Sequence, residues 1–175
     1  MTFPRLEGTA LRLATALIWL PAVTAIVWLP SLRWAFVLLV LFLSFVGACE
    51  FFAMARKLDM DARGFLVTLL APLLAAGSAI ADLRMLLAIC LLLIMAAHLL
   101  SARKDIAGLS VSILGLMYAG YLPAYFTALH QTPVSGPAMI TLLLAVIGIS
   151  DTGAYLIGKR LGKHKLAPKI SPNKT

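Results

Sequence analysis

Two acidic side chains lie where a carboxylate is hard to accommodate. Glu50 is the only charged residue well inside one of the long apolar segments, and Asp151 ends another. An ionised acid near the centre of a bilayer costs at least ~2.5 kcal/mol, so such residues are usually kept for polar sites. We therefore predict that the two acids line one polar cavity that opens to the cytoplasm. Two alternatives stay open: Glu50 as a neutral, hydrogen-bonded acid between helices, and Asp151 as an acid at the membrane interface.

Asp151 is followed by residues that suit a ligand or a closely packed helix. Tyr155 lies one helical turn after Asp151 and therefore on the same face. Gly153 and Gly158 permit the close approach of another helix or of a ligand. We predict that Tyr155 contributes to a substrate site around Asp151.

The last residues of the sequence form a pattern that suits a phosphate group. Ser171 followed by Pro172 is a start signal for a helix, and the free N–H groups of a first turn bind anions. Lys174 adds a positive charge and Thr175 a hydroxyl. We predict a phosphate-binding segment here. The alternative for the basic tail is attraction to anionic lipid, worth ~1 kcal/mol per basic residue.

The histidines and cysteines form no recognisable site. His98, His130 and His164 are spread along the sequence, so we expect no cluster of metal ligands. Cys49 and Cys90 lie inside apolar runs without paired spacing and are predicted to be small core residues. The sequence has no P-loop, dinucleotide fingerprint, nucleophile elbow or zinc-protease motif.

The elements that must position these residues are membrane helices. Of the 175 residues, 62% are hydrophobic and 13% are charged, whereas soluble domains are about 25% charged. A soluble domain of this length has too large a surface to be covered by so few polar residues. The net charge of +8 comes from basic residues between apolar runs, which favours anionic lipid and phosphorylated substrates and excludes nucleic acid as a partner.

Six stretches approach the roughly 20 apolar residues that cross a bilayer. Alternation with period 2 is absent, so we predict an all-α, polytopic bundle over residues 1–158 and a basic cytoplasmic tail over 159–175. The predicted spans are 13–32, 34–55, 64–81, 85–102, 106–129 and 137–158. A signal peptide is the alternative for the first span, but its apolar run is longer than usual and more spans follow.

Basic residues set the predicted orientation, because they are retained on the cytoplasmic side during insertion. With six spans, 13 Lys and Arg residues fall on one side and only Arg33 and Arg84 on the other. Both termini are thus predicted to be cytoplasmic. Trp28 and Trp34 flank the first outer loop as an aromatic belt, and Pro123 is expected to kink the fifth helix.

Three motifs near the end of the chain carry a resemblance to a known family. They are Ser-Asp-Thr-Gly-Ala-Tyr at 150–155, Gly-Lys-His-Lys-Leu-Ala-Pro-Lys at 162–169 and Ile-Ser-Pro-Asn-Lys-Thr at 170–175. Together they resemble the bacterial phosphatidate cytidylyltransferases, the CDP-diacylglycerol synthase family. Glu50, which precedes an aromatic residue, resembles the acid in the second helix of that family.

The resemblance implies transfer of a cytidylyl group from CTP to phosphatidic acid in the bacterial cytoplasmic membrane, with CDP-diacylglycerol and pyrophosphate as products. Catalysis would rest on alignment and charge neutralisation, with Mg²⁺ as the expected cofactor. The implied partners are CTP, phosphatidic acid and membrane lipids, and a homodimer is left open. The implied roles are catalytic for Asp151 and Lys174, metal binding for Asp151, and substrate binding for Ser171, Thr175, Glu50 and Tyr155.

The family continues beyond this pattern with a Trp-x-Gly sequence, further helices and an acidic C-terminal signature that supplies much of the metal site. The resemblance therefore implies an N-terminal fragment of a longer enzyme that is inactive alone. Two other function classes remain: a small transporter that uses Glu50 and Asp151 as an ion path, and a non-enzymatic membrane scaffold. The motifs after Gly158 favour the transferase, because a transporter has no evident need for them.

Overall fold

The computed structural model describes residues 8–57, 63–101 and 105–161, and within these ranges the chain is helical with no strand. The prediction of an all-α fold is thus confirmed. The elements are α1 (Gly8–Trp28), the 3-10 turn η1 (Pro30–Leu32), α2 (Arg33–Lys57), α3 (Gly64–Gly77), α4 (Leu83–Leu99), α5 (Ile106–Leu116), the π-turn η2 (Met117–Tyr121), α6 (Leu122–His130) and α7 (Gly136–Leu161).

Several of these helices are long and apolar enough to cross a membrane. In the described ranges they are Pro30–Lys57, Ile106–His130 and Gly136–Gly158. Leu17–Trp28, Gly64–Gly77 and Leu83–Leu99 are apolar but shorter. The chain is therefore a membrane protein, and the exact number of crossings stays a prediction. Helix α7 continues to Leu161, so the first residues after the predicted sixth span are still helical.

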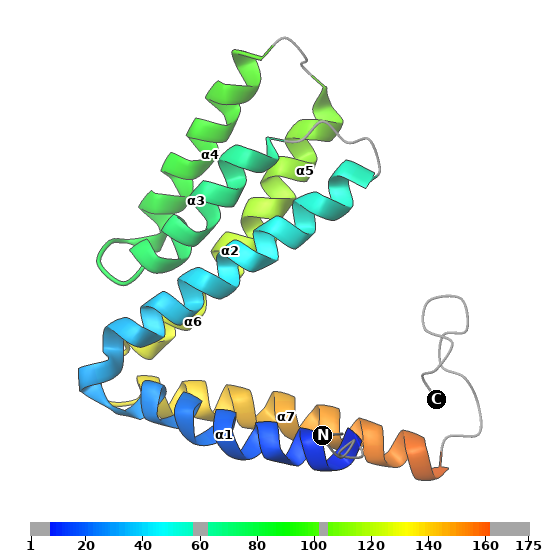
Figure 1. The fold of residues 1–175 in the computed structure, drawn as a ribbon. Coiled ribbons are helices and arrows are strands. Elements are labelled where there is room, and N and C mark those ends of the chain that lie inside the picture. The colour runs from blue at the N-terminus through cyan, green and yellow to red at the C-terminus, as the bar shows by residue number, and fades with distance from the viewer. Residues whose placement is uncertain (1–7, 58–62, 102–104, 162–175) are drawn as a thin grey trace, which may run out of the picture. The chain divides into compact units, whose positions relative to one another are not determined.

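The chain divides into two compact units, residues 1–137 and residues 138–175, and each is described by itself. In the first unit α3 is central, because it contacts α2, α4, α5, η2 and α6. Figure 1 shows α3 beside α2, with α4 and α5 next to it. The buried core of this unit comprises Ala48, Phe52, Ala55, Val67, Ala71, Leu74, Cys90, Ile94, Leu116 and Ala119.

Small residues let the helices of the first unit approach closely. A Cβ added to Gly120 would lie 2.9 Å from the Cα of Ala71, and one added to Gly115 would lie 2.5 Å from the ring of Phe52. Two apolar helices in lipid gain little from the hydrophobic effect, so their contact depends on such close packing. The two glycines thus set the distance of the fifth helical segment, which comprises α5, η2 and α6 (residues 106–130), from α3 and α2.

The fifth helical segment changes its hydrogen bonding just before Pro123. Proline has no N–H, so the carbonyl four residues earlier, that of Ala119, loses its helical partner. The segment forms the π-turn η2 at this point, and the hydroxyl of Ser44 on α2 donates a hydrogen bond to the Ala119 carbonyl. Ser44 is only 1% exposed, so this bond lies inside the unit. The kink expected at Pro123 takes the form of a π-turn that a neighbouring helix stabilises.

Polar side chains also fix the ends of α3, α4 and α5. Asp82 caps α4 by accepting from the backbone N–H of Arg84 at 2.8 Å, and Asp105 caps α5 by accepting from that of Gly108 at 2.6 Å. The backbone N–H of Arg63, at the start of α3, donates to Ser112 Oγ on α5 at 2.8 Å. These bonds satisfy donors that a helix start otherwise leaves without a partner.

The prediction for the two cysteines is half right. Cys90 is 7% exposed and belongs to the core of the first unit. Cys49, by contrast, is exposed, so its assignment as a core residue is wrong. Cys49 follows Ala48, which points into the core, and adjacent residues of a helix point about 100° apart.

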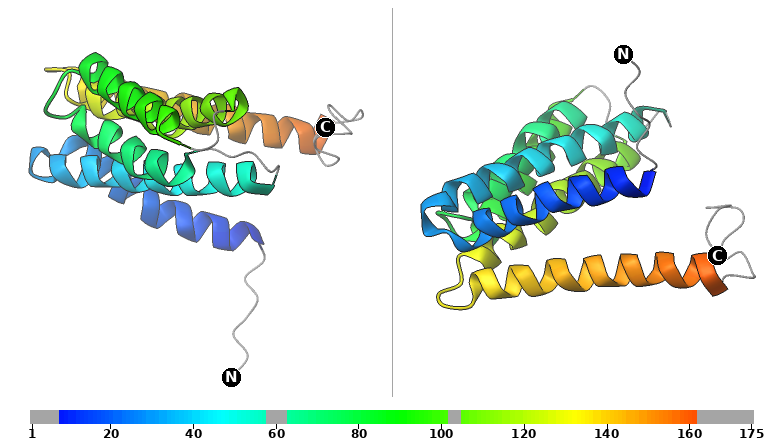
Figure 2. Two further views of the ribbon diagram at one scale, coloured as in Figure 1. Left: turned by 90° about the horizontal axis from the view of Figure 1, so that it is seen from above. Right: turned by 60° about the horizontal axis from the view of Figure 1, so that its bottom comes forward.

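The second unit begins two residues into α7, which runs as one uninterrupted helix through Leu161 (Figure 2). The turn before it contains Val134 with a φ of 67°, the one described residue other than glycine with a positive φ. A β-branched residue is disfavoured in this left-handed conformation, so the turn holds local strain.

Candidate functional site

Helix α7 carries a polar stripe along one side. At 100° per residue, Gly148, Thr152 and Tyr155 project within about 60° of one another, and Asp151 lies beside them. Asp151 and Thr152 are exposed, and Tyr155 is 54% exposed. The stripe therefore presents one carboxylate and two hydroxyls on the surface of this helix.

The opposite side of α7 is mostly apolar. Its exposed side chains include Leu142, Val146 and Ile157, and Ser150 also lies on this side. A helix with one apolar and one polar side is typical of a bundle in which lipid lies on one side and a polar cavity on the other. The predicted common face of Asp151 and Tyr155 agrees with this arrangement.

Gly148 lies on the polar stripe, whereas Gly153 points about 100° away from Thr152, toward the apolar side. A Cβ added to Gly148 or to Gly153 would meet no atom within 4 Å. Neither glycine is therefore needed for packing within the second unit. The expectation that Gly153 permits a close approach stays a prediction, because no atom of the second unit occupies that space.

Glu50 lies on α2 in the first unit, seven residues before the end of the helix at Lys57. Its side chain is exposed, and its neighbours on the same face are Gly47, where an added Cβ meets no atom within 4 Å, and Met54, which is 57% exposed. Glu50 is therefore separate from the core of this unit. Since Glu50 and Asp151 belong to different units, the prediction that they share one cavity remains a prediction.

The predicted nucleotide-phosphate residues Ser171, Lys174 and Thr175 lie outside the described residues. Nor do the described residues supply a set of metal ligands, because no group of three or more His, Cys, Asp or Glu side chains gathers among them. Asp151 alone is too few ligands for Mg²⁺, which keeps near-octahedral oxygen coordination. The described residues therefore do not form a complete Mg²⁺ site by themselves.

A family model described as "Cytidylyltransferase family" matches residues 10–175, which includes both units and the polar stripe of α7. The chain belongs to the cytidylyltransferase family. The resemblance drawn from the three C-terminal motifs is thereby confirmed.

Curated members of the cytidylyltransferase family match parts of this chain. A phosphatidate cytidylyltransferase of Staphylococcus saprophyticus is 34% identical over 100 residues, which cover 57% of this chain and 38% of the relative. One of Staphylococcus aureus (strain COL) is 45% identical over 60 residues, which cover 34% of this chain and 23% of the relative. The matched part is thus well under half of each relative. No solved structure matches the chain.

The structure also gives roles to two residues that were not predicted from the sequence, Thr152 and Ser44. Thr152 joins Asp151 and Tyr155 on the polar stripe, and its spacing of three residues from Tyr155 was the available signal. Ser44 had no such signal. The loss of the Ala119 partner follows from Pro123, but the helix that supplies the compensating hydroxyl depends on tertiary packing.

Proposed function

We propose that this chain is part of an enzyme that transfers a cytidylyl group from CTP to phosphatidic acid. The single observation that carries the proposal is the family match over residues 10–175, together with relatives named phosphatidate cytidylyltransferase. In this reaction an oxygen of the lipid phosphate attacks the α-phosphorus of CTP. The bond from the α-phosphorus to the oxygen that bridges to the β-phosphorus breaks, so CDP-diacylglycerol forms and pyrophosphate leaves.

Among the described residues, the polar stripe of α7 is the proposed contribution to this chemistry. Asp151 and the hydroxyls of Thr152 and Tyr155 can hold and orient polar groups of the substrates, since alignment supplies much of the rate in phosphoryl-type transfer. Glu50 is proposed for the same cavity. An acid in either place needs a polar surrounding, because lipid disfavours its ionised form.

Ser171, Lys174 and Thr175 are proposed to contact the phosphates of CTP, with Lys174 as a positive charge near the reacting groups. Mg²⁺ is proposed as the cofactor of the whole enzyme on the basis of the resemblance alone. It would neutralise charge on the nucleotide phosphates. Self-association of the chain into a homodimer is a further proposal.

The test is cytidylyl transfer in membranes that contain the product of the intact gene. Radiolabelled CTP and phosphatidic acid are supplied, and labelled CDP-diacylglycerol is counted. Replacement Asp151→Asn is expected to lower turnover about a hundredfold, the size of effect of removing one preorganised electrostatic group. The matched control is Asp82→Asn, because Asp82 is also exposed and asparagine caps a helix as well as aspartate does.

Equal turnover of the Asp151→Asn and Asp82→Asn variants at equal protein levels would show that the α7 stripe is not part of the proposed site. Absence of CDP-diacylglycerol with the wild-type gene product, while a staphylococcal relative is active in the same membranes, would contradict the proposed reaction.

We also propose that the protein resides in the bacterial cytoplasmic membrane with both termini in the cytoplasm, because basic residues favour that side by 13 to 2. Val134 in the turn between α6 and α7 is fully exposed, and Lys57 at the end of α2 is exposed. In a background with Cys49→Ala and Cys90→Ala, Val134→Cys should react with an impermeant thiol reagent in intact cells, and Lys57→Cys should not. The reverse pattern would invert the orientation.

A further inference from the structure

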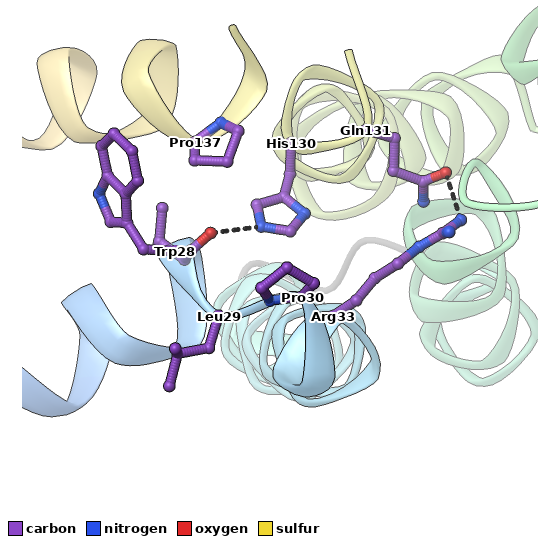
Figure 3. Close-up of a pocket in the computed structure, with 8 residues that line it drawn as sticks. Trp28, Leu29, Pro30, Arg33, His130, Gln131 and Pro137 are labelled. Carbon is purple, nitrogen blue, oxygen red and sulfur yellow. Dashed lines mark hydrogen bonds between the residues drawn. The ribbon is translucent and has the colours of Figure 1, made fainter. Parts of the chain in front are cut away.

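The first unit contains a pocket that the proposed function does not use (Figure 3). Its volume is about 370 Å³. It is lined by residues 27–30, where α1 ends and η1 begins, by Arg33 at the start of α2, by His130 and Gln131 at the end of α6, and by Pro137. The predicted topology places it on the side of the membrane away from the cytoplasmic tail.

One wall of this pocket is held by His130. The His130 Nε2 atom lies 2.9 Å from the carbonyl oxygen of Val27, and the ring stacks on Phe36 with centroids 4.2 Å apart and an angle of 15°. Both Val27 and Phe36 are buried. The wall therefore stays in place without a ligand, so the pocket is preformed.

The polar part of the pocket offers donors. Arg33 is exposed, and its Nη2 atom donates to Gln131 Oε1 at 2.9 Å. A guanidinium has five N–H donors, so this bond leaves capacity for a second acceptor. The Gln131 Nε2 group is buried and has no hydrogen-bond partner among the described residues. A buried donor without an acceptor is costly, which indicates that the pocket receives an acceptor from a ligand.

The rest of the lining is apolar, and its composition indicates what kind of ligand carries the acceptor. Trp28, Leu29, Pro30 and Pro137 form this part, and Trp28 is 50% exposed. A tryptophan beside an arginine at the end of an apolar helix is typical of the membrane–water interface. A free phosphate ion would leave this surface uncovered, whereas a phospholipid would place its glycerol and upper acyl region there.

We propose that this pocket binds an anionic phospholipid of the adjacent leaflet, with the lipid phosphate accepting hydrogen bonds from Arg33 and Gln131. The glycerol and the first carbons of an acyl chain lie against Trp28, Leu29 and Pro137. Within the described residues, no carboxylate pairs with Arg33, so the guanidinium charge is available to the phosphate. The site is separate from the polar stripe of α7.

Trp28 provides a direct readout. With Trp19→Phe and Trp34→Phe, Trp28 remains as the single tryptophan of the three in the chain. The protein is placed in vesicles of phosphatidylcholine and phosphatidylglycerol at equal amounts, with bromine on the acyl chains of one lipid at a time. Bromine quenches a nearby tryptophan, so brominated phosphatidylglycerol is expected to quench Trp28 more strongly. We expect its relative association to be about fivefold that of phosphatidylcholine, which corresponds to roughly 1 kcal/mol per basic residue.

Replacement Arg33→Gln should lower this ratio to about one, because the charge that selects the anionic lipid is lost. The matched control is Arg84→Gln, because Arg84 is an exposed arginine at the start of a helix and does not line the pocket. The ratio should persist in that variant. Gln131→Leu removes the second donor without changing the charge and should lower the ratio by about half.

A ratio of one in the parent protein would overturn the proposal. So would an equal loss in Arg84→Gln and Arg33→Gln, since that outcome indicates general attraction to the membrane surface. If Arg33→Gln does not yield folded protein, Gln131→Leu decides: an unchanged ratio in that variant contradicts the lipid site.

Discussion

The first unit and α7 distribute packing and chemistry differently. The first unit buries small and hydroxyl residues where its helices meet: Gly120 lies against the α3 backbone, and Ser44 bonds the carbonyl freed by Pro123. In α7, every residue from Thr141 to Ile157 is exposed apart from Gly153, and Asp151, Thr152 and Tyr155 lie on one side. The packing of the described part thus lies mainly in the first unit, whereas Asp151, Thr152 and Tyr155, which are proposed for the site, are exposed.

The largest expected effect on the free energy of unfolding comes from one of two glycine replacements, and the other serves as its control. Gly120→Ala would place a Cβ 2.9 Å from the Ala71 Cα, a backbone atom that cannot move aside. The helices must separate, so we expect the free energy of unfolding to fall by about 1–3 kcal/mol. Gly153→Ala meets no atom within 4 Å and should leave stability unchanged or raise it by up to ~1 kcal/mol, because alanine favours a helix over glycine. Thermal unfolding in detergent, followed by tryptophan fluorescence, measures both.

Two outcomes would break the contrast. A stable Gly120→Ala variant would mean that α3 and η2 are farther apart than the structure has them. A destabilised Gly153→Ala variant would mean that α7 is packed against a neighbour at this position.

A loss of similar size is expected when one buried hydroxyl group is removed. Ser44→Ala leaves the Ala119 carbonyl buried without a donor, which costs about 1–3 kcal/mol of unfolding free energy. The control is Ser110→Ala, since Ser110 is exposed and its hydroxyl donates to the carbonyl of Ile106 in its own helix at 2.8 Å. That change should fall within about 0.5 kcal/mol of wild type.

Denaturant titration of the two serine variants in the same detergent gives the comparison. Equal losses in Ser44→Ala and Ser110→Ala would show that the Ala119 carbonyl has another donor. A Thr replacement at Ser44 should restore part of the loss, because it retains the hydroxyl.

The smallest effect is a gain in the turn that leads into α7. Val134 has a φ of 67°, where a residue with a Cβ costs about 1–2 kcal/mol and glycine does not. Val134→Gly should therefore stabilise the turn by somewhat under 1 kcal/mol, because glycine also gives the unfolded chain more freedom. The melting temperature should rise slightly, and Val134→Ala, which keeps the Cβ, should not raise it. A lower melting temperature for Val134→Gly would contradict the left-handed conformation.

The sequence by itself determined the helical class, the membrane environment and the family. Long apolar runs separated by charges allow only helices in lipid, because every backbone polar group must be satisfied within its own segment. The motif that begins at Ser150 is local, so its chemistry could be recognised without a fold. The common face of Asp151 and Tyr155 also follows from helical periodicity alone.

Tertiary structure decided the features that depend on two segments far apart in the chain. Ser44 and Ala119 are 75 residues apart, and Arg33 and Gln131 are 98 residues apart. Nothing local in the sequence links either pair, because many helix arrangements satisfy the same apolar pattern. The exposure of Cys49 was missed for the same reason: in an apolar helix, composition does not distinguish the side that faces lipid from the side that packs, and only the position of the neighbouring helices does.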